Sequence, residues 1–167
     1  MWLRRLPITL GAAVATMSVA GACGTAGGSK PKVDNELSLY RDNTYQFSLS
    51  YPADFVVREQ PAEQLTGLEP RPLASFRILN TATDPADLEV RVFDADRTAS
   101  LKGWLRSNGL LLGEPKPFQT AHVSGVEVCS STMIAPGCSY FVLGNGWIYQ
   151  LTSASVEGES IVRTFTL

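Results

Sequence analysis

The residues of this chain that could carry out chemistry are few, and most of them are cysteines. The sequence contains three cysteines (Cys23, Cys129 and Cys138) and one histidine, His122. A cysteine sulfur can act as a nucleophile, ligate a metal, form a disulfide or accept a lipid. No G-x-S-x-G turn presents a serine nucleophile, and no glycine-rich phosphate loop precedes a helix. The surroundings of each cysteine therefore decide which chemistry the sequence supports.

Cys23 follows a segment that has the three parts of an export signal. Arg4 and Arg5 give it a basic start, residues 6–22 carry no charge, and small residues come directly before the cysteine. This order is typical of a secretory signal. Pro7 and the many small residues make the run a poor membrane-spanning helix, because a spanning helix needs about 20 strongly apolar residues. The segment therefore predicts export rather than a membrane span.

The end of this segment, Ala20-Gly21-Ala22-Cys23, resembles the lipobox of bacterial lipoproteins, whose first position is usually leucine. In that family the cysteine thiol receives a diacylglyceryl group, and the peptidase then cuts before it. The resemblance implies that Cys23 is lipidated, that residues 1–22 are removed, and that acyl chains such as palmitate anchor the product to a membrane. A plain secreted protein and an uncleaved anchor are the alternatives. We expect a bacterial cell-envelope protein that faces the periplasm or the cell surface.

Cys129 and Cys138 are an even pair in a chain that we expect outside the reducing cytosol, where disulfides form. If they face each other across a hairpin, Val126 lies opposite Phe141 and the apolar face of the hairpin stays consistent. We therefore predict a disulfide, with two buried free thiols as the alternative. A zinc site needs four ligands, and a chain with His122 as its one histidine supplies them poorly.

The remaining polar candidates point to structure rather than to catalysis. His122 precedes a glycine-containing turn, where a surface histidine or a hydrogen-bonded structural histidine is expected. Asp84, Asp87, Asp94 and Asp96 lack the fixed ligand spacing of a calcium loop. We interpret these acids as solvated turn residues, with a weak cation site as the alternative. We therefore predict no catalytic residue, no cofactor and no metal.

Charge and composition limit the partners and the domain count. The formal charge is −2 at pH 7, and it becomes more negative when the signal with its two arginines is removed. Because the chain has no basic stretch, a nucleic-acid partner is not expected. Residues 1–22 form the predicted signal, and 23–38 form a small, polar, flexible tether with a typical reach of about 20 Å. Residues 39–167 then form a single domain.

Alternation of apolar and polar residues predicts strands in the first half of this domain, at 45–51, 54–58, 73–79 and 88–93. A loop punctuated by proline and glycine spans 59–72, with one helical turn at 62–65. Loops carry function more often than packed strands do. We therefore take Leu65, Leu68 and Arg71 as candidate contact residues, with a plain surface connection as the alternative.

The second half predicts a helix and then hairpins. The apolar spacing changes to a helical period at 98–108, and strands are expected at 123–132, 139–143 and 147–152. Asn145-Gly146 is typical of a two-residue turn, in which both residues need a positive φ. The end of the chain fits either a helix or a strand, and we favour a helix over 157–164. This order predicts an α+β fold with a mainly antiparallel sheet.

The run Phe47-Ser48-Leu49-Ser50-Tyr51-Pro52, followed by an aromatic residue at Phe55, resembles the opening strand of PsbP-like domains. The closing Thr164-Phe165 resembles the Ser-Phe pair that often ends the family's last helix. Where the family commonly has glycine before the first phenylalanine, this chain has Gln46. The resemblance implies an α/β/α sandwich. Most characterised members of the family are binding or assembly factors, and few if any are enzymes.

Together these observations predict a lipid-anchored, non-enzymatic binding or assembly module. We expect it to attach to a membrane through Cys23 and to act through a protein partner. The alternatives are a carrier of a small or lipidic ligand and an envelope hydrolase.

Overall fold

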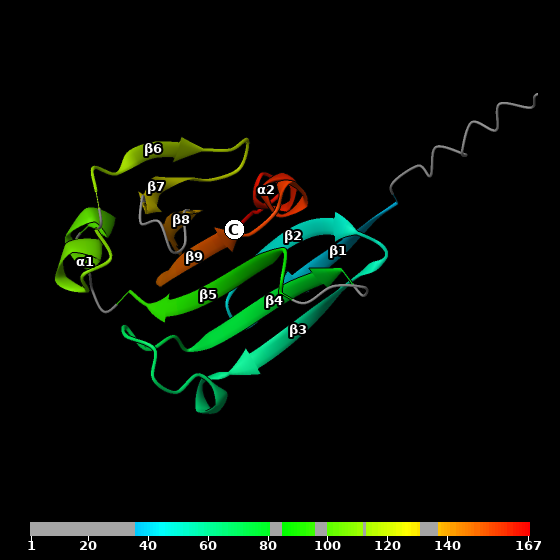
Figure 1. Ribbon diagram of the computed structural model, residues 1–167, viewed down its shortest axis with the longest axis horizontal. Helices are drawn as coiled ribbons and strands as arrows, with labels where there is room; N and C mark the ends of the chain where they lie inside the picture. The colour runs from blue at the N-terminus through cyan, green and yellow to red at the C-terminus, as the bar shows by residue number, and fades with distance from the viewer. Residues whose placement is uncertain (1–35, 81–84, 96–99, 112, 131–136) are drawn as a thin grey trace, which may run out of the picture. The chain divides into compact units, whose positions relative to one another are not determined.

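A computed structural model describes residues 36–80, 85–95, 100–111, 113–130 and 137–167, which belong to one compact unit, Val33–Leu167. Figure 1 shows the elements in chain order. They are β1 (Leu37–Asp42), β2 (Phe47–Pro52), β3 (Phe55–Pro61), the 3-10 turn η1 (Ala62–Gln64), β4 (Ala74–Asn80), β5 (Leu88–Asp94), α1 (Leu101–Ser107), β6 (Lys116–Gln119), β7 (Ser124–Ser130), β8 (Gly137–Gly144), β9 (Trp147–Ser153) and α2 (Val156–Val162).

The main sheet has seven strands in the order β3-β4-β5-β9-β8-β7-β6, and β1 and β2 form a separate hairpin. Every neighbouring pair is antiparallel. The expected α+β fold with a mainly antiparallel sheet is therefore confirmed. Side chains alternate between the two faces of the sheet, so that Val90 and Val92 of β5 join one core and Phe93 joins another.

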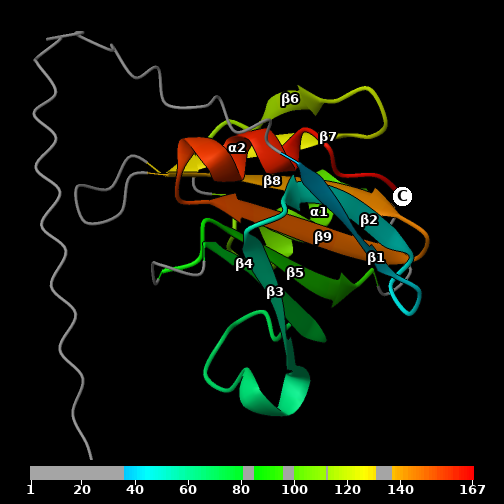
Figure 2. The same cartoon turned by 90° about the vertical axis from the view of Figure 1, so that its right-hand side faces the viewer.

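The larger core lies under the β1–β2 hairpin and α2, which Figure 2 shows side by side over β9. Its centre is aromatic. The ring of Phe47 lies 5.1 Å from Phe76, 5.5 Å from Phe165 and 5.9 Å from Tyr149, measured between centroids. All four side chains are at most 2% exposed. Burial of several aromatic rings of this size dominates the packing energy of a small domain, so these rings hold β2 and the segment after α2 against the sheet.

The smaller core lies on the opposite face of the sheet, under α1. Trp104 of the helix packs on Phe93 of β5, with 5.2 Å between ring centroids. Leu105, Phe141 and Ile148 complete this cluster and are at most 2% exposed. The helical spacing of the apolar residues in α1 is what brings Trp104 and Leu105 to the sheet together.

Both helices have only seven residues, too few to persist in water without packing. Each is capped by a serine, since Ser100 accepts a hydrogen bond from the Gly103 amide and Ser155 accepts one from the Gly158 amide. The Tyr140 hydroxyl on β8 donates to Glu159 of α2 at 2.7 Å. Burial, together with this hydrogen bond, raises the pKa of the Tyr140 phenol above its ordinary value.

The predicted strands and the two predicted helices are confirmed, and the C-terminal segment is helical. The sequence prediction omitted β1 and β6 and placed residues 59–61 in a loop, whereas β3 extends to Pro61. β1 was missed because its aliphatic residues, Leu37 and Leu39, are exposed, and Tyr40 is the one apolar residue that it packs against the larger core. The predicted turn over 81–84 and the predicted element ends at 98–99 and 131–132 lie outside the described residues.

Two turns place a residue other than glycine at positive φ. Asn145 (φ 53°) and Gly146 (φ 82°) form the predicted two-residue turn between β8 and β9. Gln46, before β2, has φ 54°, a region that glycine adopts without steric cost. The Asn145 side-chain amide donates to the Gln46 carbonyl at 3.3 Å, so one turn contacts the other.

Candidate binding site

The predicted lipidation residue, Cys23, and residues 1–22 lie outside the described residues. Of the tether predicted over 23–38, the last two residues already belong to β1. Within the part of the chain that is described, no helix has the length and apolar character that a bilayer crossing requires.

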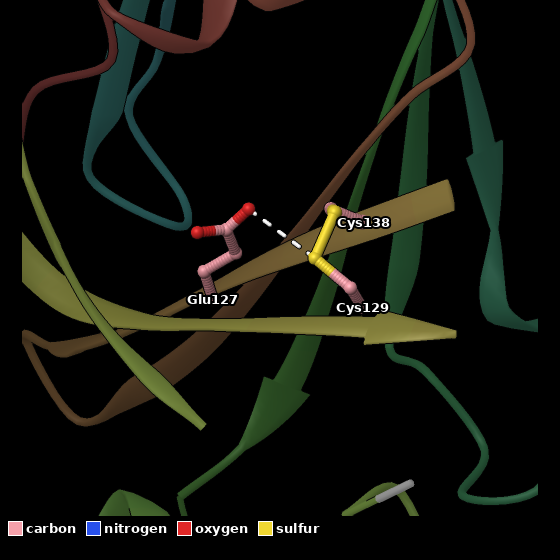
Figure 3. A group of neighbouring side chains, drawn as sticks. All are labelled: Glu127, Cys129 and Cys138. Carbon is pink, nitrogen blue, oxygen red and sulfur yellow. Dashed lines mark hydrogen bonds between the residues drawn. A yellow bond between two sulfur atoms is a disulfide. The ribbon is translucent and has the colours of Figure 1, made fainter. Parts of the chain in front are cut away.

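Cys129 and Cys138 are joined as a disulfide, with their Sγ atoms 2.04 Å apart (Figure 3). They are direct partners across β7 and β8, and Val126 lies opposite Phe141 in the same ladder. The register is the one that the alternation of apolar residues predicted. The disulfide therefore joins two strands at the end where the chain leaves β7 and returns into β8.

Three side chains around the disulfide have the spacing of metal ligands. One ligand atom each from Glu127, Cys129 and Cys138 lie within 4.8 Å of one another. A sulfur in a disulfide has no thiolate charge with which to bind a metal. The Glu127 carboxylate lies 3.3 Å from the Cys129 sulfur (Figure 3), a close contact to which the bonded sulfur brings no proton. In the oxidised protein this group is part of the hairpin structure.

Removing the disulfide is expected to lower stability while leaving the fold intact. For the double variant Cys129→Ser, Cys138→Ser we expect the free energy of unfolding to fall by about 2–3 kcal/mol, because the bond closes a loop of about ten residues in the unfolded chain. Urea unfolding of the variant and of the wild type, each with and without a thiol reductant, measures the difference. Equal midpoints for oxidised wild type and double variant would contradict the prediction.

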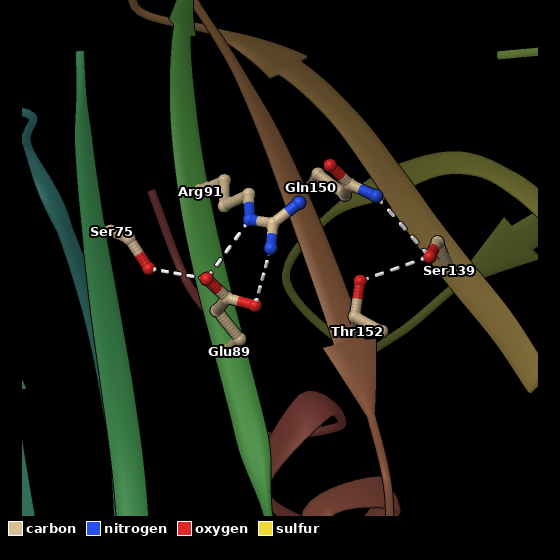
Figure 4. Close-up of polar contacts among 6 residues, drawn as sticks. All are labelled: Ser75, Glu89, Arg91, Ser139, Gln150 and Thr152. Carbon is tan, nitrogen blue, oxygen red and sulfur yellow. Dashed lines mark hydrogen bonds and ion pairs between the residues drawn. The ribbon is translucent and has the colours of Figure 1, made fainter. Parts of the chain in front are cut away.

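A row of polar side chains crosses the sheet on the face that carries the smaller core (Figure 4). Arg91 binds the Glu89 carboxylate with two hydrogen bonds of 2.9 Å, and the buried Ser75 hydroxyl donates to the same carboxylate at 2.7 Å. Farther along, the Ser139 and Thr152 hydroxyls are 2.9 Å apart. These contacts are made among the side chains of the row itself, which makes the row a structural polar layer.

His122 is not placed to activate a serine in this row. It is exposed in the turn between β6 and β7, where its backbone amide donates to the Thr120 hydroxyl at 3.1 Å. Ser75 lies on β4, and four strands of the sheet separate β4 from β6. β4 and β6 are therefore five strand spacings apart, which at about 4.8 Å per spacing is about 24 Å, far beyond hydrogen-bond reach.

The acids predicted to sit in turns are only partly described. Asp87 accepts a hydrogen bond from the Asn80 amide at 3.1 Å, which links it to the end of β4. Asp94 is the last residue of β5, so the prediction that it lies in a turn is wrong. Asp84 and Asp96 lie outside the described residues.

The predicted contact loop is held firmly to the body of the domain. Leu65 is only 6% exposed, so it packs inside and its side chain does not form part of a free contact surface. Leu68 is half-buried and Arg71 is exposed. The Arg71 guanidinium donates to the Ala62 carbonyl at 3.2 Å, and the Leu73 amide donates to the Val92 carbonyl at 2.8 Å. These bonds fix the loop over the end of β5.

A cleft lies where this loop meets α1. It has a volume of about 510 Å³ and joins loop residues to residues of the helix and β5. Its lining combines aromatic, aliphatic and charged or amide side chains: Pro70, Arg71, Leu73, Phe93, Asp94, Trp104, Ser107 and Asn108. The cleft therefore brings Arg71 together with residues that the sequence does not single out.

The helix end that borders the cleft is rigid. The Asn108 side-chain amide and the Ser107 hydroxyl both donate to the Trp104 carbonyl, at 2.9 and 3.0 Å. This arrangement closes the C-terminus of α1. Arginine and tryptophan are the residue types that most often dominate the binding energy of protein interfaces. The cleft has the exposed Arg71 at its rim, whereas Trp104 in its wall is only 8% exposed.

Sequence reasoning found Arg71 but missed Trp104, Asp94 and Asn108 as parts of one site. The sequence indicates only that Trp104 packs in a helix and that Asn108 ends it, and both residues do so. Asp94 is the last residue of β5 and follows Phe93, which packs in the smaller core. Nothing in the sequence indicates that the loop folds over this strand end, because that contact depends on tertiary structure.

No protein-family model matches the chain, and no curated protein matches it. Among solved structures it is similar to the solution structure of cyanobacterial PsbP (CyanoP) from Synechocystis sp. PCC 6803. The TM-score is 0.51, with 12% identity over 88% of this chain and 98% of that chain. A crystal structure from Bacteroides thetaiotaomicron VPI-5482 gives a TM-score of 0.47, with 12% identity over 76% of this chain and 47% of that one. The first likeness shows that this chain has a PsbP-like fold.

Proposed function

We propose that the protein is a lipid-anchored, non-enzymatic binding or assembly module of the bacterial cell envelope. It attaches to the membrane through Cys23, faces the periplasm or the cell surface, and acts through a protein partner that docks at the cleft between the 65–73 loop and α1. The export segment and the lipobox-like Ala20-Gly21-Ala22-Cys23 support the anchor.

The cleft is the single observation that carries the binding function. Its lining combines Arg71, whose guanidinium can pair with a carboxylate or carbonyl, with the edge of Trp104 that the core leaves exposed, 8% of that residue. The charged and amide groups of the lining favour a protein surface over a small apolar ligand, because small-molecule sites are mostly apolar cavities. The hydrogen bonds at Ala62 and Leu73 hold the loop in place before binding, which lowers the ordering cost of association.

The experiment is capture from envelope extract with variants of the cleft. Arg71→Glu reverses the charge at the rim, and we expect the recovered partner to fall by about tenfold or more, the size of a hot-spot effect. Arg58→Glu is the matched control, because Arg58 is equally exposed but lies on β3, outside the cleft. Equal recovery by both variants would contradict a partner site at the cleft.

We also propose that the domain is the α/β/α sandwich that the resemblance implied. The support is the pair of cores on opposite faces of the sheet, one with α2 and the other with α1.

A further inference from the structure

A second hollow lies on the other side of the sheet, between the β1–β2 hairpin and α2. Its volume is about 300 Å³. The Thr164 hydroxyl, just after the helix, accepts from the Ser50 amide and donates to the Ser50 carbonyl, each at 2.9 Å, and so fixes the helix end to β2. The lining is Leu37, Ser50, Pro52, Val156, Glu157, Ser160, Ile161 and Thr164. We call this hollow the α2 groove.

The rim of the α2 groove and the adjoining strand expose large apolar side chains. Leu37 is 60% exposed, Leu39 is 62% exposed, and Val156 is 78% exposed. The alternation of β1 explains this, since Tyr40 points toward the core and packs on Phe47 at 5.9 Å between centroids, while Leu37 and Leu39 point away. Exposed apolar side chains gathered at one place indicate an interaction surface.

Leu37 follows the predicted lipid anchor closely in sequence, so the surface around it can meet a membrane. Leu37 begins β1 and is itself part of the groove lining. If Cys23 holds the lipid and the residues before Leu37 form the tether expected from their composition, the typical reach of that tether would be about 20 Å. The domain is then confined at high effective concentration above the bilayer, so that even weak apolar contact is populated.

Charge around the α2 groove favours a neutral membrane surface. Glu36 and Glu157 are exposed beside Leu37 and Val156, and the exposed bases of the same elements are Arg41 and Arg163. Attraction to anionic lipid requires clusters of lysine and arginine. Asp42 of β1 and Glu159 of α2 add two half-buried acids, so these elements carry no basic cluster. Apolar side chains among such charges fit a zwitterionic headgroup layer.

We propose that the α2 groove docks on the interfacial layer of a neutral phospholipid bilayer, with Leu37, Leu39 and Val156 at the boundary between headgroups and acyl chains. This inference rests on the anchor of the proposed function. It assigns the opposite face of the sheet to the membrane and leaves the cleft beside α1 open to a partner.

The test uses the chain that begins at Cys23, whose thiol is the one cysteine outside the disulfide. Cys23 is coupled to a maleimide lipid in phosphatidylcholine vesicles that contain brominated acyl chains, which quench nearby tryptophan. Val156→Trp reports on the α2 groove. Lys102→Trp, at an exposed position on α1, is the matched control. The emission of the native tryptophans is subtracted with the wild type.

We expect about half of the added emission of Val156→Trp to be quenched, since interfacial side chains reach about 5–10 Å into the bilayer. The Lys102→Trp emission should be unaffected. Adding Leu37→Ser and Leu39→Ser to the Val156→Trp chain should remove the quenching. All three changed positions are exposed, so folding is retained, and circular dichroism verifies it.

Equal quenching of the two reporters, or none for Val156→Trp, overturns the proposal. A spectral shift that grows with protein density without quenching also overturns it, because a second copy then covers the α2 groove. Since the maleimide lipid supplies the anchor, an absence of quenching contradicts the docking proposal alone and leaves the proposed lipidation of Cys23 untouched. If the protein isolated from cells carried no lipid on Cys23, that result would instead contradict the proposed function.

Discussion

Cys23→Ala is expected to move the protein from the membrane pellet to soluble or unprocessed material. Each CH₂ of an acyl chain that enters the bilayer contributes about 0.8 kcal/mol, and two acyl chains give stable attachment whereas one gives reversible attachment. Without the thiol no diacylglyceryl group can be added. The exposed side chains of Leu37, Leu39 and Val156 cannot replace the lipid, because their contact with the membrane depends on the local concentration that the anchor provides.

Fractionation of envelopes, with immunoblotting of pellet and supernatant, measures this effect. The double variant Cys129→Ser, Cys138→Ser is the matched control, since it removes two cysteines and retains Cys23. It should remain in the pellet. A Cys23→Ala protein that is processed and still equally membrane-bound would exclude the lipid as the anchor.

Gly158→Ala is expected to lower the free energy of unfolding by about 2–3 kcal/mol, the cost of forcing an extra methyl group into a filled site. Gly158 is buried in α2, and an added Cβ would collide with the carbonyl oxygen of Asp87 and lie 2.7 Å from the Ser153 hydroxyl oxygen. The Asp87 backbone cannot easily yield, because its carbonyl accepts from the Ala154 amide at 2.9 Å and its amide donates to Ile78 at 3.0 Å.

The sign of this effect is opposite to the intrinsic helix preference, which favours alanine over glycine by about 1 kcal/mol. Urea unfolding measures it. Gly137→Ala at the start of β8 is the control, because an added Cβ there meets nothing within 4 Å. A Gly158→Ala protein as stable as the wild type would show that α2 does not pack closely against the Asp87 backbone.

Much of this fold is predictable because each face of the sheet has its own core. Phe47 and Leu49 alternate with serines on β2, and both are at most 2% exposed. The Cys129–Cys138 pairing follows from the same alternation on β7 and β8. Asn145-Gly146 specifies its turn by backbone conformation alone.

The parts that could not be predicted depend on contacts distant in sequence. Leu65 looks like an exposed loop residue, yet it is buried by the way the loop folds back. The cleft joins Arg71 to Trp104, which no local pattern brings together. Gln46 occupies a left-handed backbone position where the resembled family commonly has glycine, and the Asn145 amide bonds to its carbonyl there.

Lipidation of Cys23 is tested by the intact mass of the mature protein purified from the membrane fraction. We expect a chain that begins at Cys23 and carries the added mass of a diacylglyceryl group on that residue. A mature chain that begins at another residue, or one with an unmodified Cys23, would contradict it.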